Sequence, residues 1–515
     1  TPRLTGSIAL RGARVDDLIL TRYRETLEPD SPPITLLSPE GSASAFFSRF
    51  GWAAAGSGIT LPKADTLWEA EGGPLTPASP VTLRWNNGEG LTFEQVFAID
   101  ENYLFTVTQR VINDSGATVN LAPFGLVSRT GTPDILGFYI LHEGPLGVFD
   151  GTLKEVDYDD LKDSYPGQGP NREVVIATDT TGGWIGITDK YWLTALVPDQ
   201  QAAVKTRFVY TQPNGLDNYQ SDFLYPPSEI APGAAAETTS RLFAGAKQVP
   251  LLERYQEEFG ITNFDLAVDF GWFYIITKPI FWALHYLNAW FGNFGLAILG
   301  LTVVIKLIFF PLANKSYKSM AKMRKLQPKM MELRERFAED KQRLNQEMMA
   351  LYKKEGANPL SGCLPILIQI PVFFALYKVM FVTIEMRHAP FYGWIKDLSA
   401  QDPTSILNGF GLFPWDAPDL GVLNLLNIGV WPLLMGISMF LQQKLNPQPP
   451  DPVQAKIFLM MPIIFTLLLA TFPAGLVIYW TWNNVLSMAQ PACIMRRHGV
   501  PLGSGKPQTA EKGDD

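Results

Sequence analysis

The chain has 515 residues, too many for one ordinary domain, and its 42 basic and 50 acidic side chains give a net charge of −8. Residues 1–260 hold 19 basic and 33 acidic side chains (net −14), whereas residues 261–515 hold 23 and 17 (net +6). The second half also contains apolar runs too long for the core of a water-soluble protein. These observations exclude a wholly soluble protein.

From residue 4 to residue 249, short apolar alternations such as Thr92–Ala98 and Leu104–Ile112 are separated by turn sequences at 86–88, 113–116 and 181–183. This pattern predicts a large all-β sandwich over residues 1–250, with a dozen to two dozen strands. No run in it approaches the roughly 20 apolar residues that cross a bilayer, so we expect this domain to face water. Because residue 1 is a threonine within strand-like sequence, we expect the natural gene product to begin upstream.

Two features of this β region admit a ligand-binding interpretation. Five acidic residues lie between 155 and 163, but the glycine and terminal glutamate of a calcium-binding EF-hand loop are missing, so we expect a solvated loop. Exposed tryptophan and tyrosine side chains would suit carbohydrate binding, although aromatic residues in a sandwich are more often core. Structural roles are favoured for both.

Residues 251–292 are expected to form a linker and an amphipathic helix. Aromatic residues are dense from residue 264, and Lys278, Pro279, His285 and Asn288 interrupt the apolar pattern. Tryptophan and tyrosine at this density favour the headgroup region of a membrane. We therefore predict a helix that lies in the interface and does not span the bilayer.

Five apolar runs then predict an α-helical bundle of five transmembrane helices within residues 293–495, at about 294–313, 363–383, 423–441, 457–471 and 473–494. Prolines inside or beside these runs indicate kinked helices whose neighbours satisfy the freed carbonyl groups. They are Pro365, Pro371, Pro432, Pro462 and Pro473.

The loops between the runs predict the orientation. Residues 313–362 hold twelve basic and six acidic side chains, whereas residues 384–422 hold two basic and five acidic ones. The positive-inside rule places the first loop in the cytosol and the second outside. In a bacterium, this places the helical part in the inner membrane and the β domain in the periplasm. The tail at 496–515 is then cytosolic.

Within the first loop, residues 314–356 predict a cytosolic helical hairpin. Apolar residues recur at helical spacing on both sides of a turn at 338–340. Methionines suited to adaptable contact enrich the apolar face: Met320, Met323, Met330, Met331, Met348 and Met349. This apolar face fits packing of one helix on the other, with the basic residues in contact with anionic lipid. The hairpin also fits contact with ribosomal RNA or with an incoming apolar polypeptide.

Lys306 lies within the first apolar run, and Thr302 precedes it by one turn on the same face. A cation at that depth costs at least about 2.5–3.5 kcal/mol, so we expect it to face the bundle interior or water. The alternative is that its long side chain snorkels to the interface.

Further polar residues stand in the other runs. Individually they fit interhelical hydrogen bonds, and together they would line a hydrated groove with Lys306. They are Gln369, Ser438, Tyr479, Trp482, Asn483 and Asn484. The five runs hold no carboxylate, which disfavours a proton relay.

Enzymatic chemistry has no support in the sequence. Cys363 and Cys493 lie in or beside apolar runs, which excludes a disulfide framework and a cysteine-type zinc site. The four histidines are far apart in the sequence, and nucleophile–base pairs and phosphate-binding loops are missing. We expect no metal, no cofactor and no enzyme.

Seven motifs in this order resemble the YidC membrane protein insertases of Gram-negative bacteria. They are YKSMAKMR at 317–324, LQPK at 326–329, QEMMALYK at 346–353, NPL at 358–360, GCLP at 362–365, LSAQDP at 398–403 and FPAGL at 472–476. The resemblance is strong over residues 264–495. It implies an insertase core with a hydrophilic groove open to the cytosol and the lipid, a large periplasmic domain, and a further transmembrane helix upstream of residue 1.

The resemblance also implies roles for particular residues. Lys306 occupies the place where the family usually has an arginine that attracts acidic or polar parts of a nascent chain. Lysine keeps the charge but loses the bidentate fork of arginine. The strongly basic tail that contacts the ribosome in some members is absent from residues 499–515.

The sequence thus favours an insertase and chaperone of inner-membrane proteins that works alone or with the Sec translocon (SecYEG and SecDF). Its expected partners are nascent inner-membrane proteins, membrane lipids and in some circumstances the ribosome, but not DNA. Two alternatives stay open. One is a lipid or small-solute transporter with the sandwich as a capture domain, and the other is an assembly scaffold.

Overall fold

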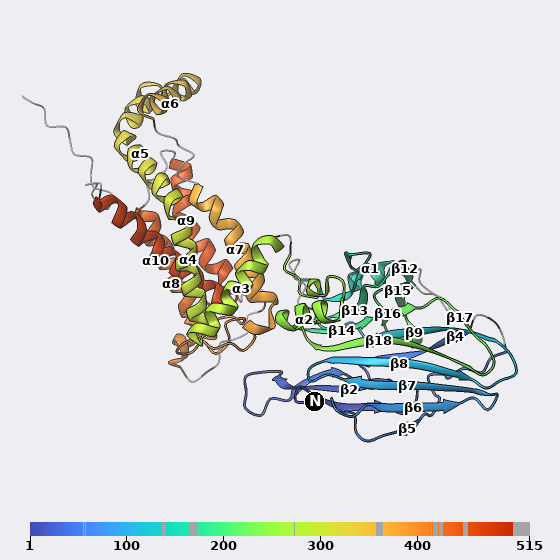
Figure 1. Cartoon of the computed structure of the whole chain (residues 1–515). Helices are drawn as coiled ribbons and strands as arrows, with labels where there is room; N and C mark the ends of the chain where they lie inside the picture. Colours follow the sequence, from blue (N-terminus) through green and yellow to red (C-terminus); the bar gives the residue numbers. More distant parts are fainter. Residues whose placement is uncertain are drawn as a thin grey trace, which may run out of the picture. The chain divides into compact units, whose positions relative to one another are not determined.

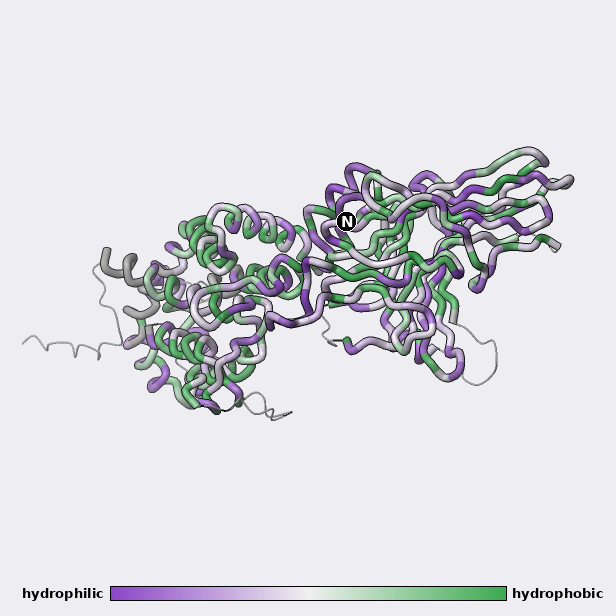
Figure 2. Tube along the Cα trace, turned by 90° about the horizontal axis from the view of Figure 1, so that it is seen from below, coloured by the Kyte–Doolittle hydropathy of each residue, from purple (hydrophilic) through white to green (hydrophobic). Residues whose placement is uncertain are grey.

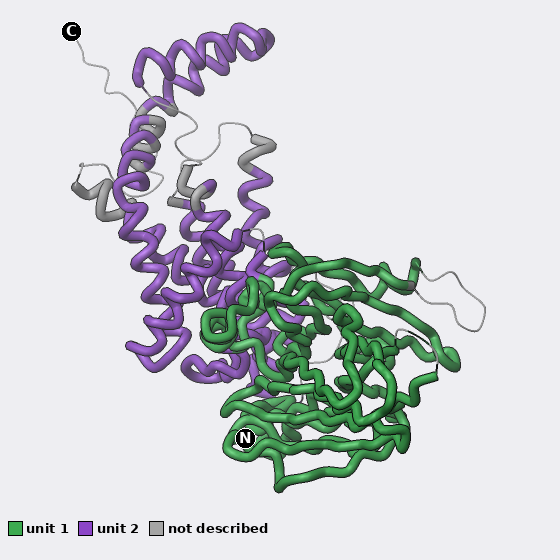
Figure 3. The backbone as a smooth tube through the Cα atoms, turned by 45° about the vertical axis from the view of Figure 1, so that its right-hand side comes forward, with its two compact units in different colours: residues 1–269, 382–384 green, residues 270–381, 385–515 purple. Residues whose placement is uncertain are grey.

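The structure, a computed structural model, has strands in the first half of the chain and helices in the second (Figure 1). Hydrophobic residues are dense over much of the helical part, whereas the strands mix both kinds (Figure 2). Two compact units result, residues 1–269 with 382–384, and residues 270–381 with 385–515 (Figure 3). The described residues are 1–54, 56, 58–135, 141–164, 174–271, 273–356, 364–413, 415, 421, 426–445 and 452–497.

The first unit contains two antiparallel nine-stranded sheets. One sheet comprises β1 Leu4–Ala9, β2 Arg14–Arg24, β3 Pro33–Leu37, β4 Phe46–Ala54, β9 Val119–Thr130, β12 Val174–Thr181, β15 Ala203–Thr211, β16 Asn218–Leu224 and β17 Ser228–Ile230. The other comprises β5 Glu69–Glu71, β6 Val81–Asn86, β7 Leu91–Ile99, β8 Leu104–Asn113, β10 Gly144–Phe149, β11 Thr152–Glu155, β13 Trp184–Thr188, β14 Trp192–Val197 and β18 Ala234–Ala246.

The two sheets pack face to face. Gln95 on β7 and Gln109 on β8 cross the core and donate hydrogen bonds to the carbonyls of Phe50 and Gly51 on β4, at 3.0 and 2.7 Å. All three predicted turns fall between strands, and Gly183 is required in one of them because a Cβ there would lie 2.0 Å from the Val148 carbonyl oxygen. The predicted all-β sandwich is confirmed.

The first unit continues beyond the boundary at residue 250 that composition indicates. Helix α2 (Val249–Phe259) buries Leu251, Leu252 and Tyr255, and the 3-10 helix η2 (Phe264–Ala267) buries Phe264. The Tyr255 hydroxyl donates a hydrogen bond to the Asp100 carboxylate in the turn between β7 and β8. These contacts explain why residues 251–269 belong to the sandwich and not to a linker.

The acidic cluster at 155–163 is not the solvated loop that we expected. It includes the short helix α1 (Tyr158–Asp163), in which Tyr158 and Leu161 are buried and the acidic side chains are exposed. Asp159 and Asp160 occupy its first turn, where negative charge favours a helix. A second short turn, the 3-10 helix η1 (Pro213–Gly215), connects β15 to β16.

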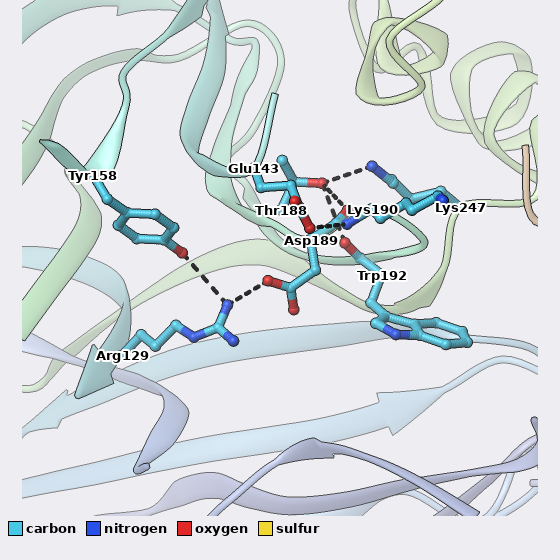
Figure 4. Close-up of polar contacts among 8 residues, drawn as sticks. All are labelled: Arg129, Glu143, Tyr158, Thr188, Asp189, Lys190, Trp192 and Lys247. Carbon is cyan, nitrogen blue, oxygen red and sulfur yellow. Dashed lines mark hydrogen bonds and ion pairs between the residues drawn. The ribbon is translucent and has the colours of Figure 1, made fainter. Parts of the chain in front are cut away.

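A buried polar network lies at one end of the sandwich (Figure 4). Lys247, which directly follows β18, donates a hydrogen bond of 2.8 Å to the Thr188 hydroxyl, and burial lowers the pKa of Lys247 to about 8. Next to Thr188, Asp189 accepts a hydrogen bond of 2.6 Å from Arg129 on β9. Arg129 also donates to the Tyr158 hydroxyl at 3.4 Å, so the network joins both sheets and α1.

The second unit is helical. Its elements are α3 Tyr274–Phe291, α4 Phe294–Ile308, α5 Phe310–Arg336, α6 Lys341–Glu355, α7 Leu364–Val382, the 3-10 helices η4 Ile384–Met386 and η5 Ile406–Gly411, α8 Val430–Leu445, α9 Pro452–Leu469 and α10 Ala474–Arg497. Helices α4, α7, α8, α9 and α10 overlap the five predicted spans, and α5 and α6 form the predicted hairpin at one end of the bundle (Figure 1).

Three of the predicted spans have a limit that differs by five residues or more. The first ends early, because the chain bends by 62° between α4 and the start of α5, where Pro311 occupies the first turn of the new helix. The third begins at Val430, after three described residues (427–429) that are not helical, and the fourth begins at Pro452 and not at 457. Within the described ranges, no single helix combines the length and apolar composition for crossing a membrane, but the bent pair Phe294–Ile308 and Phe310–Ser316 does so together.

A proline in α9 shows how the bundle satisfies the backbone. Pro462 lies inside the helix and has no N–H, so the carbonyl of Phe458 one turn earlier loses its usual partner. The Gln443 side chain of α8 donates a hydrogen bond to that carbonyl. The predicted repair of a proline site by a neighbouring helix is therefore present in this pair.

Candidate functional site

The candidate site lies along α10, which packs against α4 and α8. Tyr479, Asn483 and Ser487 recur every four residues, and Asn484 lies beside them, so one polar stripe runs along an otherwise apolar helix. All four residues are buried. The stripe makes side-chain hydrogen bonds to α4, α7 and α8, one to each helix.

Lys306 makes the first of these bonds. It is partly buried in the last turn of the apolar helix α4, and its Nζ donates a hydrogen bond of 2.8 Å to the Ser487 hydroxyl. Among the residues that the structure describes, Lys306 forms no ion pair. The ammonium group thus faces α10 with one neutral partner, which opposes the alternative that it snorkels away from the bundle.

The other two bonds tie α10 to α7 and α8. Gln369 of α7 donates to the Tyr479 hydroxyl. Asn484 donates to the Ser438 hydroxyl of α8 at 3.0 Å, and Ser438 in turn donates to the Met435 carbonyl at 2.7 Å. These bonds fix the rotation of α10, so that its polar side chains face the other helices.

Three more of the predicted groove residues have different surroundings. The buried Asn483 Oδ1 and the buried Trp482 Nε1 have no hydrogen-bond partner within the described ranges, which leaves an acceptor and a donor unused. The Thr302 hydroxyl donates to the Ile298 carbonyl of its own helix at 2.7 Å. Thr302 is therefore paired within α4, unlike these two atoms of Asn483 and Trp482.

The hairpin separates its methionines into two groups. Met330 is buried with Leu326, and Met348 packs against them, so these residues hold α5 to α6. Met331 and Met349 are exposed instead. The side chain of Met323 lies outside the described residues. The two alternatives for the apolar face of the hairpin were helix packing and contact with another molecule. The buried and the exposed methionines divide between them.

Comparison with known proteins identifies the family. The profile of the YidC periplasmic domain matches residues 1–283, and that of the 60Kd inner membrane protein matches residues 286–500. The chain belongs to the YidC family. It is 53% identical to the membrane protein insertase YidC of Nitrobacter hamburgensis, over 98% of this chain and 83% of the relative. It is 52% identical to that of Bradyrhizobium diazoefficiens (98% and 82%) and 53% identical to that of Granulibacter bethesdensis (97% and 86%).

Family membership settles the nature of the two units. The sandwich is a periplasmic domain, the helical unit is an inner-membrane domain, and the protein is a membrane protein insertase, which is not an enzyme. Within the described ranges, no group of three or more histidine, cysteine, aspartate or glutamate residues is placed to hold a metal ion.

Sequence reasoning missed two connections of the site. Ser487 shares the spacing of Tyr479 and Asn483, but nothing in the sequence pairs it with Lys306, which lies 181 positions away. Gln443 was also missed, because its role depends on the carbonyl that Pro462 frees in a different helix. The available signal was Pro462 itself. A proline inside an apolar run indicates that a carbonyl group needs another hydrogen-bond donor, but it does not show which residue supplies that donor.

Proposed function

We propose that this insertase receives its substrates along the polar stripe of α10, with Lys306 as the attracting charge. The observation that carries the proposal is the Lys306–Ser487 hydrogen bond of 2.8 Å, in which a cation within an apolar helix faces the polar stripe of α10 and has no carboxylate partner among the described residues. A cation in such surroundings attracts acidic or polar groups strongly, because little water screens it. The acidic or polar flank of a nascent chain fits this description.

The stripe lowers the cost of moving a polar flank part of the way across the membrane. A donor (Trp482 Nε1) and an acceptor (Asn483 Oδ1) without described partners are available for the backbone groups of an extended flank. The apolar segment that follows then enters the lipid, and this transfer yields about 25 cal/mol for each Å² removed from water. Membrane potential adds a further force on acidic flanks.

The hairpin is the proposed first contact for an apolar segment. Met331 and Met349 are exposed on adjacent helices of a basic hairpin, and methionine adapts to apolar partners of different shape. The twelve basic residues at 313–362 support a cytosolic position for this hairpin, and a cytosolic C-terminus follows from five spans. The predicted position of α3 at the membrane interface is retained, since Trp290, Tyr286 and Ile275 are exposed.

Removing the charge tests the proposal. In reconstituted vesicles, Lys306→Ala is expected to impair insertion of single-span substrates with acidic outer tails, whereas Lys306→Arg keeps the charge and preserves insertion. Lys444→Ala is the matched control, because Lys444 lies in the last turn of α8 and is exposed over the Phe440 ring. Normal insertion by Lys306→Ala would remove Lys306 from the mechanism.

Cooperation with the Sec translocon is a separate part of the proposal. It is supported by the family resemblance and by the size of the periplasmic sandwich, which offers surface for a protein partner. Co-purification of SecYEG or SecDF with the full chain, and its loss when residues of the sandwich surface are changed, is the expected result. Insertion at the native rate in vesicles that contain no Sec components would show that Sec is dispensable for that substrate.

A further inference from the structure

The segment between α7 and α8 forms a compact platform around one carboxylate. Asp402 is buried and accepts four hydrogen bonds, from Trp394 Nε1 at 3.1 Å, from the Thr404 amide and hydroxyl at 3.0 and 2.7 Å, and from the Trp431 amide at 2.9 Å. The last of these caps the first turn of α8. Gly429 lies so close to the carboxylate that a Cβ there would be 2.6 Å from its Cγ.

Backbone hydrogen bonds fasten the platform to two helices. The amides of Ala474 and Gly475, at the start of α10, donate to the carbonyls of Ala400 and Leu398 at 2.7 and 3.0 Å. The Ile406 amide donates to the Ile428 carbonyl at 2.9 Å, two residues before α8. The platform is therefore held at the ends of α8 and α10 and does not depend on flexible connections alone.

An apolar loop, residues 405–413 with Trp415, is joined to this platform. Leu412 is 88% exposed, and about half of the Phe413, Trp415 and Ile406 surfaces is exposed. The Phe413 and Trp415 rings stack with centroids 4.5 Å apart and planes at 4°. The Trp415 Nε1 is satisfied by the Leu407 carbonyl at 3.2 Å, so the stacked pair presents an apolar surface.

The backbone of the apolar loop is strained where it turns. Phe410 has a φ of +61°, between Gly409 at +62° and Gly411 at +89°. Glycine adopts this left-handed conformation freely, whereas a phenylalanine does so at a cost in free energy. Hydrogen bonds from the Phe410 amide to the Ser405 carbonyl (2.6 Å) and from the Gly411 amide to Asn408 Oδ1 (3.0 Å) hold the turn in place.

Charge and connectivity indicate what covers the apolar loop. Residues 403–415 contain no charged side chain, although acidic residues stand on both sides at 402 and 416. The periplasmic sandwich precedes α4, and α7 returns the chain across the membrane, so α7 and α8 meet on the periplasmic side. Leu434, Ile437 and Leu441 are exposed along α8, and this lipid-facing row starts four residues after Val430. The apolar loop precedes α8 on the periplasmic side, which puts it at the level of the headgroups.

We infer that the apolar loop inserts Leu412 and the Phe413–Trp415 pair into the periplasmic leaflet of the inner membrane. Tryptophan, phenylalanine and leucine without neighbouring charge are the composition that enters the headgroup and upper acyl region. Because the platform is hydrogen-bonded to the starts of α8 and α10, insertion of the loop would also fix these two helix ends at the membrane surface. The inference goes beyond the proposed groove, because it assigns a lipid-binding surface on the opposite side of the membrane from the hairpin.

The test places an environment-sensitive probe on the loop of the full chain. In a background with Cys363→Ser and Cys493→Ser, Leu412→Cys carries an NBD fluorophore, and the protein is reconstituted in phosphatidylcholine nanodiscs. Quenching by lipids with a nitroxide at the headgroup or the upper acyl chain is expected to be about twofold or more stronger than for the matched Gln401→Cys probe, which is exposed on the same platform. Leu412 is so exposed that the change leaves folding intact.

Two outcomes overturn the inference. In one, lipid quenching is equal at both positions and a water-soluble quencher reaches the Leu412→Cys probe. This result would show that the loop lies in water. The other is a Leu412→Cys probe protected from both quenchers, which would assign the surface to a protein contact or a second copy of the chain. Neither depends on insertion activity, so failure of the proposed groove would be seen separately.

Discussion

One lysine in each compact unit is withdrawn from bulk water, and each donates a hydrogen bond of 2.8 Å to a hydroxyl group. Lys247 of the sandwich bonds to Thr188 and is surrounded by the carboxylates of Asp189, Asp269, Glu143 and Glu155, which favour its charged form. Lys306 of the bundle bonds to Ser487 and forms no ion pair among the described residues. The same residue type is thus surrounded by carboxylates in one unit and has one neutral hydrogen-bond partner in the other.

The difference teaches that burial of a charge does not by itself mark a functional site. The neighbours of Lys247 belong to a closed network, in which the Thr188 hydroxyl also donates to the Trp192 carbonyl and Arg129 binds Asp189 (Figure 4). Lys306 instead bonds to Ser487 on α10, a helix that also carries two buried polar atoms without described partners, at Trp482 and Asn483. The proposed role in binding an incoming chain therefore rests on the second arrangement and not on the first.

The largest expected effect is on the pH dependence of stability, when the buried lysine of the sandwich is replaced. The pKa of Lys247 is lowered from 10.5 to about 8, so between these pH values the unfolded state binds more protons, and stability rises as pH increases from 8 to 10.5. The full rise is about 3 kcal/mol for a shift of this size. Lys247→Met should abolish it in denaturant titrations of the full chain at several pH values. The exposed Lys205→Met should leave the pH dependence unchanged.

The second prediction concerns Lys306 and the charge of its substrate. With an acidic outer tail, insertion by Lys306→Ala is expected to be roughly tenfold slower than by the native protein, which corresponds to about 1.4 kcal/mol. Replacing the acidic residues of the tail by serine should remove most of that difference, because the attraction needs both charges. A tenfold defect that persists with the serine tail, measured in the same vesicles, would contradict an electrostatic role.

A smaller effect is expected for the hydrogen bond between α8 and α10. A double-mutant cycle with Ser438→Ala and Asn484→Leu should give a coupling free energy of about 0.6 kcal/mol, and at most roughly 1.7 kcal/mol. Denaturation in mixed micelles measures it. Thr481→Val is the control partner for Ser438→Ala, because the Thr481 hydroxyl bonds the Val477 carbonyl of its own helix. Equal coupling in both cycles would show that the measured value is not due to the hydrogen bond.

The smallest effect on stability is expected in the hairpin. Replacing the exposed Met331 and Met349 by serine should change the free energy of unfolding by less than about 0.5 kcal/mol, and yet reduce crosslinking of the hairpin to an apolar nascent chain. Serine at Met330 and Met348 should instead loosen the contact between α5 and α6. Equal crosslinking by all variants would assign the methionines to packing and lipid contact alone.

Much of the fold followed from sequence pattern. Alternation and turn residues predicted the sandwich, and apolar runs predicted five helices at nearly the observed positions. The break after Ile308 was not predicted, because the apolar pattern continues through it and the decisive residue, Pro311, also suits the first turn of a helix. Helix α1 was missed because its two buried residues are hidden among five acidic ones.

The site was predictable as a set of residues but not as an arrangement. Lys306 was found from the free-energy cost of a cation within the membrane, and Tyr479, Asn483 and Asn484 were found as closely spaced polar residues in an apolar run. Their pairing depends on how helices rotate against one another, and that rotation is fixed by contacts distant in sequence, such as Asn484 with Ser438. The Asp402 platform was only partly visible, because three of the donors lie within eight positions of Asp402, at Trp394 and Thr404, whereas the fourth, the Trp431 amide, becomes a neighbour only when α8 forms.

The most direct test of the account is photocrosslinking to a stalled nascent chain. A crosslinker is placed at Lys306 and Tyr479, with Ile463, which is exposed on α9, as the control position. The account predicts crosslinks from Lys306 and Tyr479 to the polar flank of the substrate, and none from Ile463 to that flank. Crosslinks from Ile463 without any from Lys306 or Tyr479 would contradict it, and would mean that substrates pass outside the polar stripe of α10.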